Sequence, residues 1–168
     1  MKNSTEIERK YIILKPDPSC MRALDGYTES HITQTYLYSA ENETRRVRKR
    51  VWGDRVEYTE TVKRRLSRIS ASEKERELSE SEYCSMLSEI CQGTAPLEKI
   101  RYTFTYLGKV FEVDFYPQWY KTAILETELQ SEDEHITFPD FIKILREVSG
   151  IREYTNAHMS MKFPDEII

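Results

Sequence analysis

The chain has 168 residues, a formal net charge of −4 and 32% charged residues. This length is typical of one domain that buries a sizeable core, so we expect a single domain over residues 1–168. The sequence contains no run of about 20 apolar residues, which excludes a membrane-spanning helix, and its three cysteines lack metal-ligand spacing. We therefore expect a cytoplasmic protein with reduced thiols and no membrane partner.

Basic residues concentrate between positions 45 and 68, where ten lysines and arginines stand against three acids, a local balance of +7. The rest of the chain therefore carries −11, since the whole chain carries −4. A basic block inside an acidic protein indicates a polyanionic ligand, although a solvated charged hairpin produces the same pattern.

Strands are predicted in the N-terminal half by β-branched and aromatic residues that alternate with polar ones. Pro16 and Pro18 end the first strand and open a short helix, and Trp52-Gly53-Asp54 is typical of a hairpin turn. The expected elements are a strand over 6–14, a helix between 18 and 26, a strand over 31–38, hairpin strands over 43–51 and 55–63, and an irregular loop over 64–72.

The C-terminal half is predicted to hold two helices and three strands. Ser79 and Glu82 fit a capping box, and apolar residues follow at helical spacing up to Gly93. From Phe138 to Gly150 apolar residues again recur at helical spacing, which predicts a second amphipathic helix. Between the two helices, alternation predicts strands over 99–106, 110–116 and 122–130.

Six strands, with the segment from Lys74 to Leu78 counted as one of them, carry charged residues at positions i and i+2. These pairs are Glu6/Glu8, Arg46/Arg48, Glu75/Glu77, Lys99/Arg101, Glu112/Asp114 and Glu126/Glu128. An ordinary antiparallel sheet also alternates, because its polar face meets water, but like-charged neighbours repel unless an opposite charge lies between them. A closed antiparallel barrel with inward charged faces resolves this repulsion, because its acidic strands could hold a divalent metal and its basic strands an anion. The outward apolar faces would need cover, which the two helices could supply in part.

The order and spacing of these motifs resemble the CYTH, or triphosphate tunnel metalloenzyme, superfamily over nearly the whole chain. Its signature is an N-terminal E-x-E-x-K, which is carried here by Glu6, Glu8 and Lys10. The further matching segments are Thr35-Tyr36-Leu37, Arg46-Val47-Arg48, Thr61-Val62-Lys63, Glu75-Arg76-Glu77, Lys99-Ile100-Arg101, Asp114, Glu126-Thr127-Glu128 and Tyr154-Thr155-Asn156-Ala157.

The resemblance implies an α+β fold, mainly antiparallel β, in which eight strands close into a tunnel flanked by a few helices. It implies a small-molecule triphosphate as partner and Mg²⁺ or Mn²⁺ as cofactor, and it leaves a homodimer open. The phosphate-binding residues that it implies are Lys10, Arg46, Arg48, Lys63, Lys99 and Arg101. The carboxylates on the metal side are Glu6, Glu8, Glu126 and Glu128, with Glu75, Glu77 and Asp114 completing the acidic wall.

The resemblance also implies a catalytic pair, Lys10 and Tyr36. Because Lys10 is expected to lie among other cations, we expect a depressed pKa for its ammonium group and an exchange of protons with Tyr36.

The expected function is metal-dependent hydrolysis of inorganic triphosphate or a related triphosphate, because cationic side chains and a divalent ion supply much of the catalysis of phosphoryl transfer. Two alternatives share the fold: a class IV-type adenylate cyclase, which converts ATP into cyclic AMP and pyrophosphate, and a thiamine triphosphatase with Trp52 or Trp119 as a stacking surface. A further alternative, from another functional class, is a non-enzymatic protein that binds RNA or polyphosphate. Acidic doublets that repel a phosphate backbone argue against it, so we expect no nucleic-acid partner.

Overall fold

A computed structural model gives the structure of residues 2–168, in which nine strands dominate and the helices are short. The strands are β1 (Lys2–Leu14), β2 (Asp25–Leu37), β3 (Glu43–Trp52), β4 (Arg55–Arg65), β5 (Ser70–Leu78), β6 (Leu97–Tyr106), β7 (Lys109–Phe115), β8 (Thr122–Glu128) and β9 (Ile144–Glu147). The helical elements are α1 (Pro18–Arg22), α2 (Glu80–Met86), η1 (Leu87–Glu89), η2 (Arg152–Tyr154) and α3 (Asn156–Met159). Within the described range, no helix has the length and apolar character that crossing a membrane requires.

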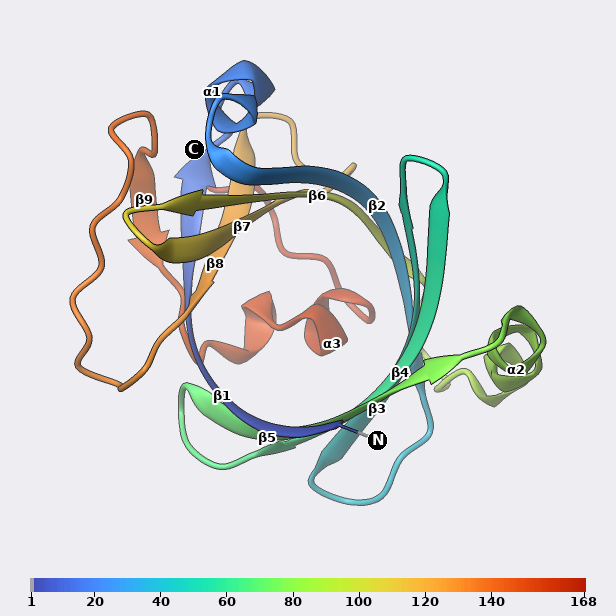
Figure 1. The fold of residues 1–168 in the computed structure, drawn as a ribbon. Helices are drawn as coiled ribbons and strands as arrows, with labels where there is room; N and C mark the ends of the chain where they lie inside the picture. The colour runs from blue at the N-terminus through green and yellow to red at the C-terminus, as the bar shows by residue number, and fades with distance from the viewer. Residues whose placement is uncertain (1) are drawn as a thin grey trace.

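Strands β1 to β8 form a closed antiparallel barrel, and β9 adds one strand outside the ring (Figure 1). The order around the barrel is β1-β5-β4-β3-β2-β6-β7-β8, with β8 returning to β1. The long strand β1 closes the ring because residues 2–7 pair with β5 while residues 8–14 pair with β8. The predicted fold class, an eight-stranded closed barrel with a few helices, is confirmed.

Period-two alternation places the charged doublets inside the barrel and the apolar residues outside. Glu8 and Arg46 line the internal cavity, whereas Tyr11, Val47 and Leu125 are buried in outer clusters. The inward orientation inferred from like-charged neighbours is therefore present.

Helix α2 covers the outer face of one side of the barrel. Its Tyr83 and Met86 pack in a cluster with residues of β2, β3 and β5. The predicted capping box is confirmed: Glu82 N donates to Ser79 Oγ at 3.1 Å, and Ser79 N donates to the Glu82 carboxylate at 2.7 Å. The helix ends at Met86, before the expected Gly93, because the chain tightens into the 3-10 turn η1.

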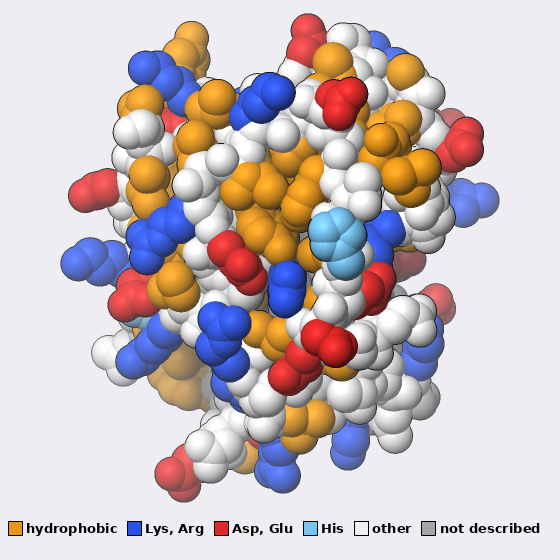
Figure 2. Space-filling model, turned by 90° about the vertical axis from the view of Figure 1, so that its left-hand side faces the viewer, with side chains coloured by type: hydrophobic (Ala, Val, Ile, Leu, Met, Phe, Trp, Pro, Cys, Tyr) orange, Lys and Arg blue, Asp and Glu red, His pale blue; other side chains and the backbone are white. Residues whose placement is uncertain are grey.

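The second amphipathic helix, predicted from Phe138 to Gly150, is wrong. Phe138, Phe141 and Ile142 do pack on the outer face of the barrel, but from an irregular segment, and residues 144–147 form β9. One edge of β1 pairs with β5 over residues 2–7. Beyond residue 7 that edge is open to another strand, and β9 pairs with residues 11–13 of β1. On this side of the molecule, hydrophobic side chains gather at the centre of the face and charged ones surround them (Figure 2).

The irregular loop predicted over 64–72 is shorter than expected, because β4 runs to Arg65 and β5 begins at Ser70. The turn between them is held against the barrel: Glu8 N donates to the Ile69 carbonyl at 2.9 Å, and Arg68 donates to the Ser149 carbonyl at 3.1 Å. Gly150 has a φ of +69°, and a Cβ there would lie 2.6 Å from the Arg68 carbonyl oxygen, so this contact needs glycine.

The C-terminal segment enters the barrel, and α3 lies within the ring of strands in the view of Figure 1. Tyr154 and Met159 pack with Ile12, Tyr116 and Trp119 in a buried apolar cluster. The barrel interior, for which the sequence predicted charged inner faces, therefore also contains an apolar core. Apolar packing fills one end of the barrel and fixes the C-terminal segment beside the charged cavity.

Candidate active site

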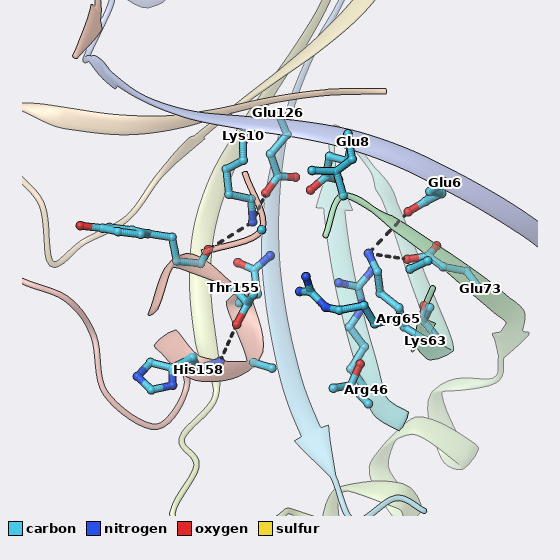
Figure 3. A pocket seen from close by; sticks show the side chains of 18 of the residues that line it. Glu6, Glu8, Lys10, Arg46, Lys63, Arg65, Glu73, Glu126, Thr155 and His158 are labelled. Atoms are coloured by element: carbon cyan, nitrogen blue, oxygen red, sulfur yellow. Dashed lines mark hydrogen bonds and ion pairs between the residues drawn. The ribbon is translucent and has the colours of Figure 1, made fainter. Parts of the chain in front are cut away.

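The charged inner faces enclose a cavity of about 790 Å³ (Figure 3). Most of the predicted site residues line it: Glu6, Glu8, Lys10, Tyr36, Arg46, Arg48, Lys63, Glu75, Arg101, Glu126 and Glu128. The other three do not. Glu77 is exposed at the end of β5, and Lys99 and Asp114 are buried within the wall.

Arg46 and Arg48 project from β3 with guanidinium groups that the protein neutralises only in part: burial would lower the pKa of Arg46, but Tyr36 and Glu73 outweigh burial and raise it. The Nε atoms of both are buried without a hydrogen-bond partner in residues 2–168. In that range Arg46 forms no ion pair, and Arg48 approaches only Glu75, at 4.0 Å. Burial, and then the nearby Arg46 and Arg101, lower the pKa of Arg48 to about 10, which leaves it charged at neutral pH. Half-buried cations whose Nε atoms lack acceptors favour an anionic ligand.

Lys63 on β4 lies between two carboxylates (Figure 3), with its Nζ 3.1 Å from Glu73 Oε1 and 3.6 Å from Glu6 Oε2. Burial, and then repulsion from Glu73, raise the pKa of Glu6 to about 8. Sequence reasoning missed Glu73, although it precedes Glu75 at the same i, i+2 spacing. The acidic pair that β5 presents to the cavity is therefore Glu73 and Glu75.

A buried network neutralises the cations of β1 and β6. Lys10 Nζ lies 2.8 Å from Glu126 Oε1, and Lys99 Nζ lies 2.7 Å from Asp114 Oδ2. Arg101 donates two hydrogen bonds to Asp114, each at 2.7 Å. Burial would raise the pKa of Glu126, but Lys10 and Arg101 outweigh it and hold this pKa well below its ordinary value. Burial, and then Arg101, lower the pKa of Lys99 to about 8.

Lys10 and Tyr36 line the same cavity, but no hydrogen bond joins them in the described chain. Lys10 Nζ donates to the Tyr154 carbonyl at 3.2 Å, and Tyr36 OH accepts from Gln34 Nε2 at 3.5 Å. Burial would lower the pKa of Lys10, yet Glu126 and Glu8 outweigh burial and raise it above its ordinary value. The expected depressed pKa is wrong, because carboxylates and not cations dominate around Lys10.

Glu8 and Glu128 are the carboxylates best suited to a divalent cation. They lie directly opposite each other in the β1–β8 register, and neither forms an ion pair with any lysine or arginine of residues 2–168. Burial, and then Glu126, raise the pKa of Glu8 to about 7. Facing carboxylates repel unless a cation lies between them, and oxygen donors suit Mg²⁺ or Mn²⁺.

The donors are not assembled into a complete cage, since the described residues contain no group of three His, Cys, Asp or Glu side chains positioned to hold a metal ion. Mg²⁺ is commonly bound by one or two carboxylates, with water and substrate phosphates as its other ligands. The carboxylates of Glu8 and Glu128 would therefore suit such an ion if a substrate phosphate supplied further ligands.

The C-terminal segment forms another side of the cavity, which the sequence indicated only through the Tyr154-Thr155-Asn156-Ala157 motif. Asn156 and His158 line the cavity beside Tyr154. Tyr116 OH on the barrel wall donates to Asn156 Oδ1 at 2.8 Å. Lys10 and Tyr154 are 144 positions apart in sequence, so local patterns could not have paired them.

Neither tryptophan considered as a stacking surface lines the cavity. Trp119 is 2% exposed, and its Nε1 donates to the Pro164 carbonyl at 3.0 Å. Trp52 lies at the end of β3, with the Arg50 guanidinium 4.5 Å from its ring centroid. The cavity itself therefore offers no indole surface to an organic group.

No family model matches the chain. A curated inorganic triphosphatase from Acetivibrio thermocellus is 33% identical over 127 residues, which cover 75% of this chain and 77% of that protein. The solved inorganic triphosphatase NE1496 is similar with a TM-score of 0.58 at 24% identity, over 96% of this chain and 98% of that one. The PH1012 protein from Pyrococcus horikoshii OT3 gives a TM-score of 0.52 at 18% identity, over 75% and 80% of the two chains. The structural likenesses show the fold and the sequence relative shows the family: the chain belongs to the CYTH, or triphosphate tunnel metalloenzyme, superfamily.

Proposed function

We propose that this protein hydrolyses inorganic triphosphate with the help of a divalent metal ion. The observation that carries the proposal is the pair of half-buried arginines Arg46 and Arg48, whose buried Nε atoms find no acceptor in residues 2–168. A linear triphosphate supplies several anionic oxygens in a row, which is what two arginines at i and i+2 on a strand are spaced to bind.

The chain's own residues position the substrate. Arg46 and Arg48 bind phosphate oxygens from one side, and Lys63 on the neighbouring strand β4 adds a third cation. Lys10 stays protonated and keeps Glu126 in place through their ion pair at 2.8 Å. Phosphoryl transfer needs such positioning and charge neutralisation more than covalent help.

Glu8 and Glu128 are the residues that would hold the metal ion, with Glu6 and Glu126 beside them. A bound divalent ion supplies charge neutralisation for the phosphate oxygens and lowers the pKa of a coordinated water. The roles of Glu73 and Glu75 are to keep Lys63 and Arg48 extended into the cavity, through contacts of 3.1 Å and 4.0 Å.

Inorganic triphosphate is preferred over ATP and thiamine triphosphate because the cavity lining is rich in charged side chains and neither tryptophan belongs to it. The activity named for the Acetivibrio thermocellus relative supports the same choice. Lys99 and Asp114, buried in the wall, support the site by fixing Arg101 and do not contact substrate in this proposal.

The proposal is tested by following phosphate and pyrophosphate release from tripolyphosphate, ATP and thiamine triphosphate, with Mg²⁺, with Mn²⁺ and with EDTA. We expect fast, metal-dependent release of phosphate from tripolyphosphate and slower turnover of the other two. Cyclic AMP formed with equimolar pyrophosphate from ATP would replace the proposal with a cyclase. No turnover of any of the three would contradict an enzymatic role.

A further inference from the structure

The side chain of Asn156 is held in one orientation by a buried tyrosine. Tyr116, which directly follows β7, is 1% exposed, and its hydroxyl donates to Asn156 Oδ1 at 2.8 Å. A carboxamide has one acceptor oxygen and a donor NH₂ group. With Oδ1 occupied by Tyr116, the Asn156 side chain can offer further partners mainly its NH₂ group.

That NH₂ group has no acceptor in the described chain, although Asn156 lines the cavity. Its neighbours on the C-terminal segment are already engaged: the Tyr154 carbonyl accepts from Lys10 at 3.2 Å, and Thr155 Oγ1 accepts from His158 N at 3.2 Å. Asn156 therefore contributes a free neutral donor on the side where the C-terminal segment closes the cavity.

We infer that Asn156 is a substrate-binding residue whose Nδ2 donates to a phosphate oxygen, and that Tyr116 is the residue that positions it. This inference rests on the proposed triphosphatase function. A neutral donor strengthens binding without adding a further positive charge to a cavity that already contains several. Because Tyr116 fixes the amide before substrate arrives, little side-chain entropy is lost on binding.

The test is calorimetric titration of tripolyphosphate into the metal-free protein, which measures binding without turnover. Asn156→Ala removes the donor, so we expect Kd to rise about tenfold, the scale of a hydrogen bond to a charged group. Asn156→Asp retains the acceptor for Tyr116 and aims a carboxylate at the phosphate, so the loss should be larger, about 100-fold.

Tyr116→Phe removes only the positioning hydroxyl and should raise Kd by about threefold, since the amide then samples orientations that do not donate. The double variant Asn156→Ala/Tyr116→Phe should bind no more weakly than Asn156→Ala alone, because Tyr116 acts through Asn156. Two additive losses would show that Tyr116 supports the fold and not the amide, and would overturn its positioning role.

Asn42→Asp is the matched control, because Asn42 also lines the cavity but no hydrogen bond holds its side chain in the described residues. Its effect on Kd should be at least fivefold smaller than that of Asn156→Asp. Equal losses in the two Asp variants, or wild-type affinity in Asn156→Ala, would overturn the inference while leaving the proposed function intact. Failure of the wild-type protein to bind tripolyphosphate would instead refute the proposed function.

Discussion

Two walls of the same cavity carry cations in opposite states. On β3, Arg46 and Arg48 are half-buried with unpartnered Nε atoms, and the nearest carboxylate contact of Arg48 is at 4.0 Å. On β1 and β6, Lys10 and Arg101 are held by carboxylates at 2.7–2.8 Å. Burying an unpaired cation costs free energy that a ligand can recover, whereas a paired one is satisfied without ligand. The β3 wall is thus suited to bind an anion, whereas the ion pairs of the β1–β6 wall stabilise the barrel.

The largest expected effect comes from breaking the paired wall. Asp114→Asn removes the charge of a fully buried carboxylate that contacts both Lys99 and Arg101. Loss of one partner from a buried ion pair costs about 3–5 kcal/mol, so the free energy of unfolding should fall by that amount. Urea denaturation followed by circular dichroism measures it. An unchanged midpoint would mean that this network does not stabilise the barrel.

Removal of an unpaired cation should weaken substrate binding without lowering stability. Arg48→Gln should weaken tripolyphosphate binding by about 100-fold, which corresponds to roughly 2–3 kcal/mol for a charge-assisted hydrogen bond. The melting temperature should stay the same or rise, since the protein gives this arginine little neutralisation. The KM for tripolyphosphate and a thermal melt measure the two quantities on one sample.

Arg45→Gln is the matched control for this variant, because Arg45 lies on the outer face of β3 and pairs with Glu60 at 2.7 Å and Glu89 at 2.5 Å. Here we expect lower stability and an unchanged KM. If the Arg45 and Arg48 variants behaved alike, the distinction between paired and unpaired arginines would fail.

A smaller effect is expected at the metal side. Glu8→Gln should weaken Mn²⁺ binding about tenfold, because one of two facing carboxylates is lost. Electron paramagnetic resonance of free Mn²⁺ measures the affinity. Glu98→Gln, at an exposed carboxylate of β6, should leave the affinity at the wild-type value. Equal affinities in all three proteins would place the metal ion elsewhere.

The last prediction is a dependence of stability on pH. The pKa values of Glu6 and Glu8 are raised from 4.5 to about 8 and about 7, so the metal-free folded state holds protons that the unfolded state has lost. Stability should therefore be fully present below about pH 4.5 as far as these two groups are concerned, and should fall as pH rises to about 8. Metal affinity should rise over the same interval, since metal ligands must be deprotonated.

Thermal melts in EDTA at pH 5.5 and 8.5 measure this slope, and saturating Mn²⁺ should reverse it. A melting temperature in EDTA that rises with pH would contradict the raised pKa values of the two glutamates.

The sequence was most informative where side chains alternate along strands. Glu6 and Glu8, and Arg46 and Arg48, could be assigned to an inner face because period two puts both members of each pair on one face, and a closed barrel places opposite charges between them. The acidic residues of β5 that face the cavity were harder to predict: Glu73 was overlooked, and Glu77 falls outside the cavity. The part of a strand that lines the barrel depends on its neighbouring strands, which local sequence does not specify.

Long-range packing was not accessible from local patterns. The apolar residues from Phe138 onward recur at helical spacing, but they cover a curved barrel from an irregular segment, and the edge of β1 recruits residues 144–147 as a strand. The contacts of Lys10 with Tyr154 and of Tyr116 with Asn156 likewise depend on the path of the C-terminal segment into the barrel.

The most direct measurement is calorimetric titration of tripolyphosphate into the wild-type protein and into the Arg46→Gln/Arg48→Gln double variant. If the unpaired arginines of β3 are the anion site, the wild-type protein should bind one tripolyphosphate per chain, and the double variant, still folded by its thermal melt, should bind none detectably. Equal affinities in the two proteins would contradict the central claim, because the phosphate chain would then be held without the only inner-wall arginines of β3 that line the described cavity.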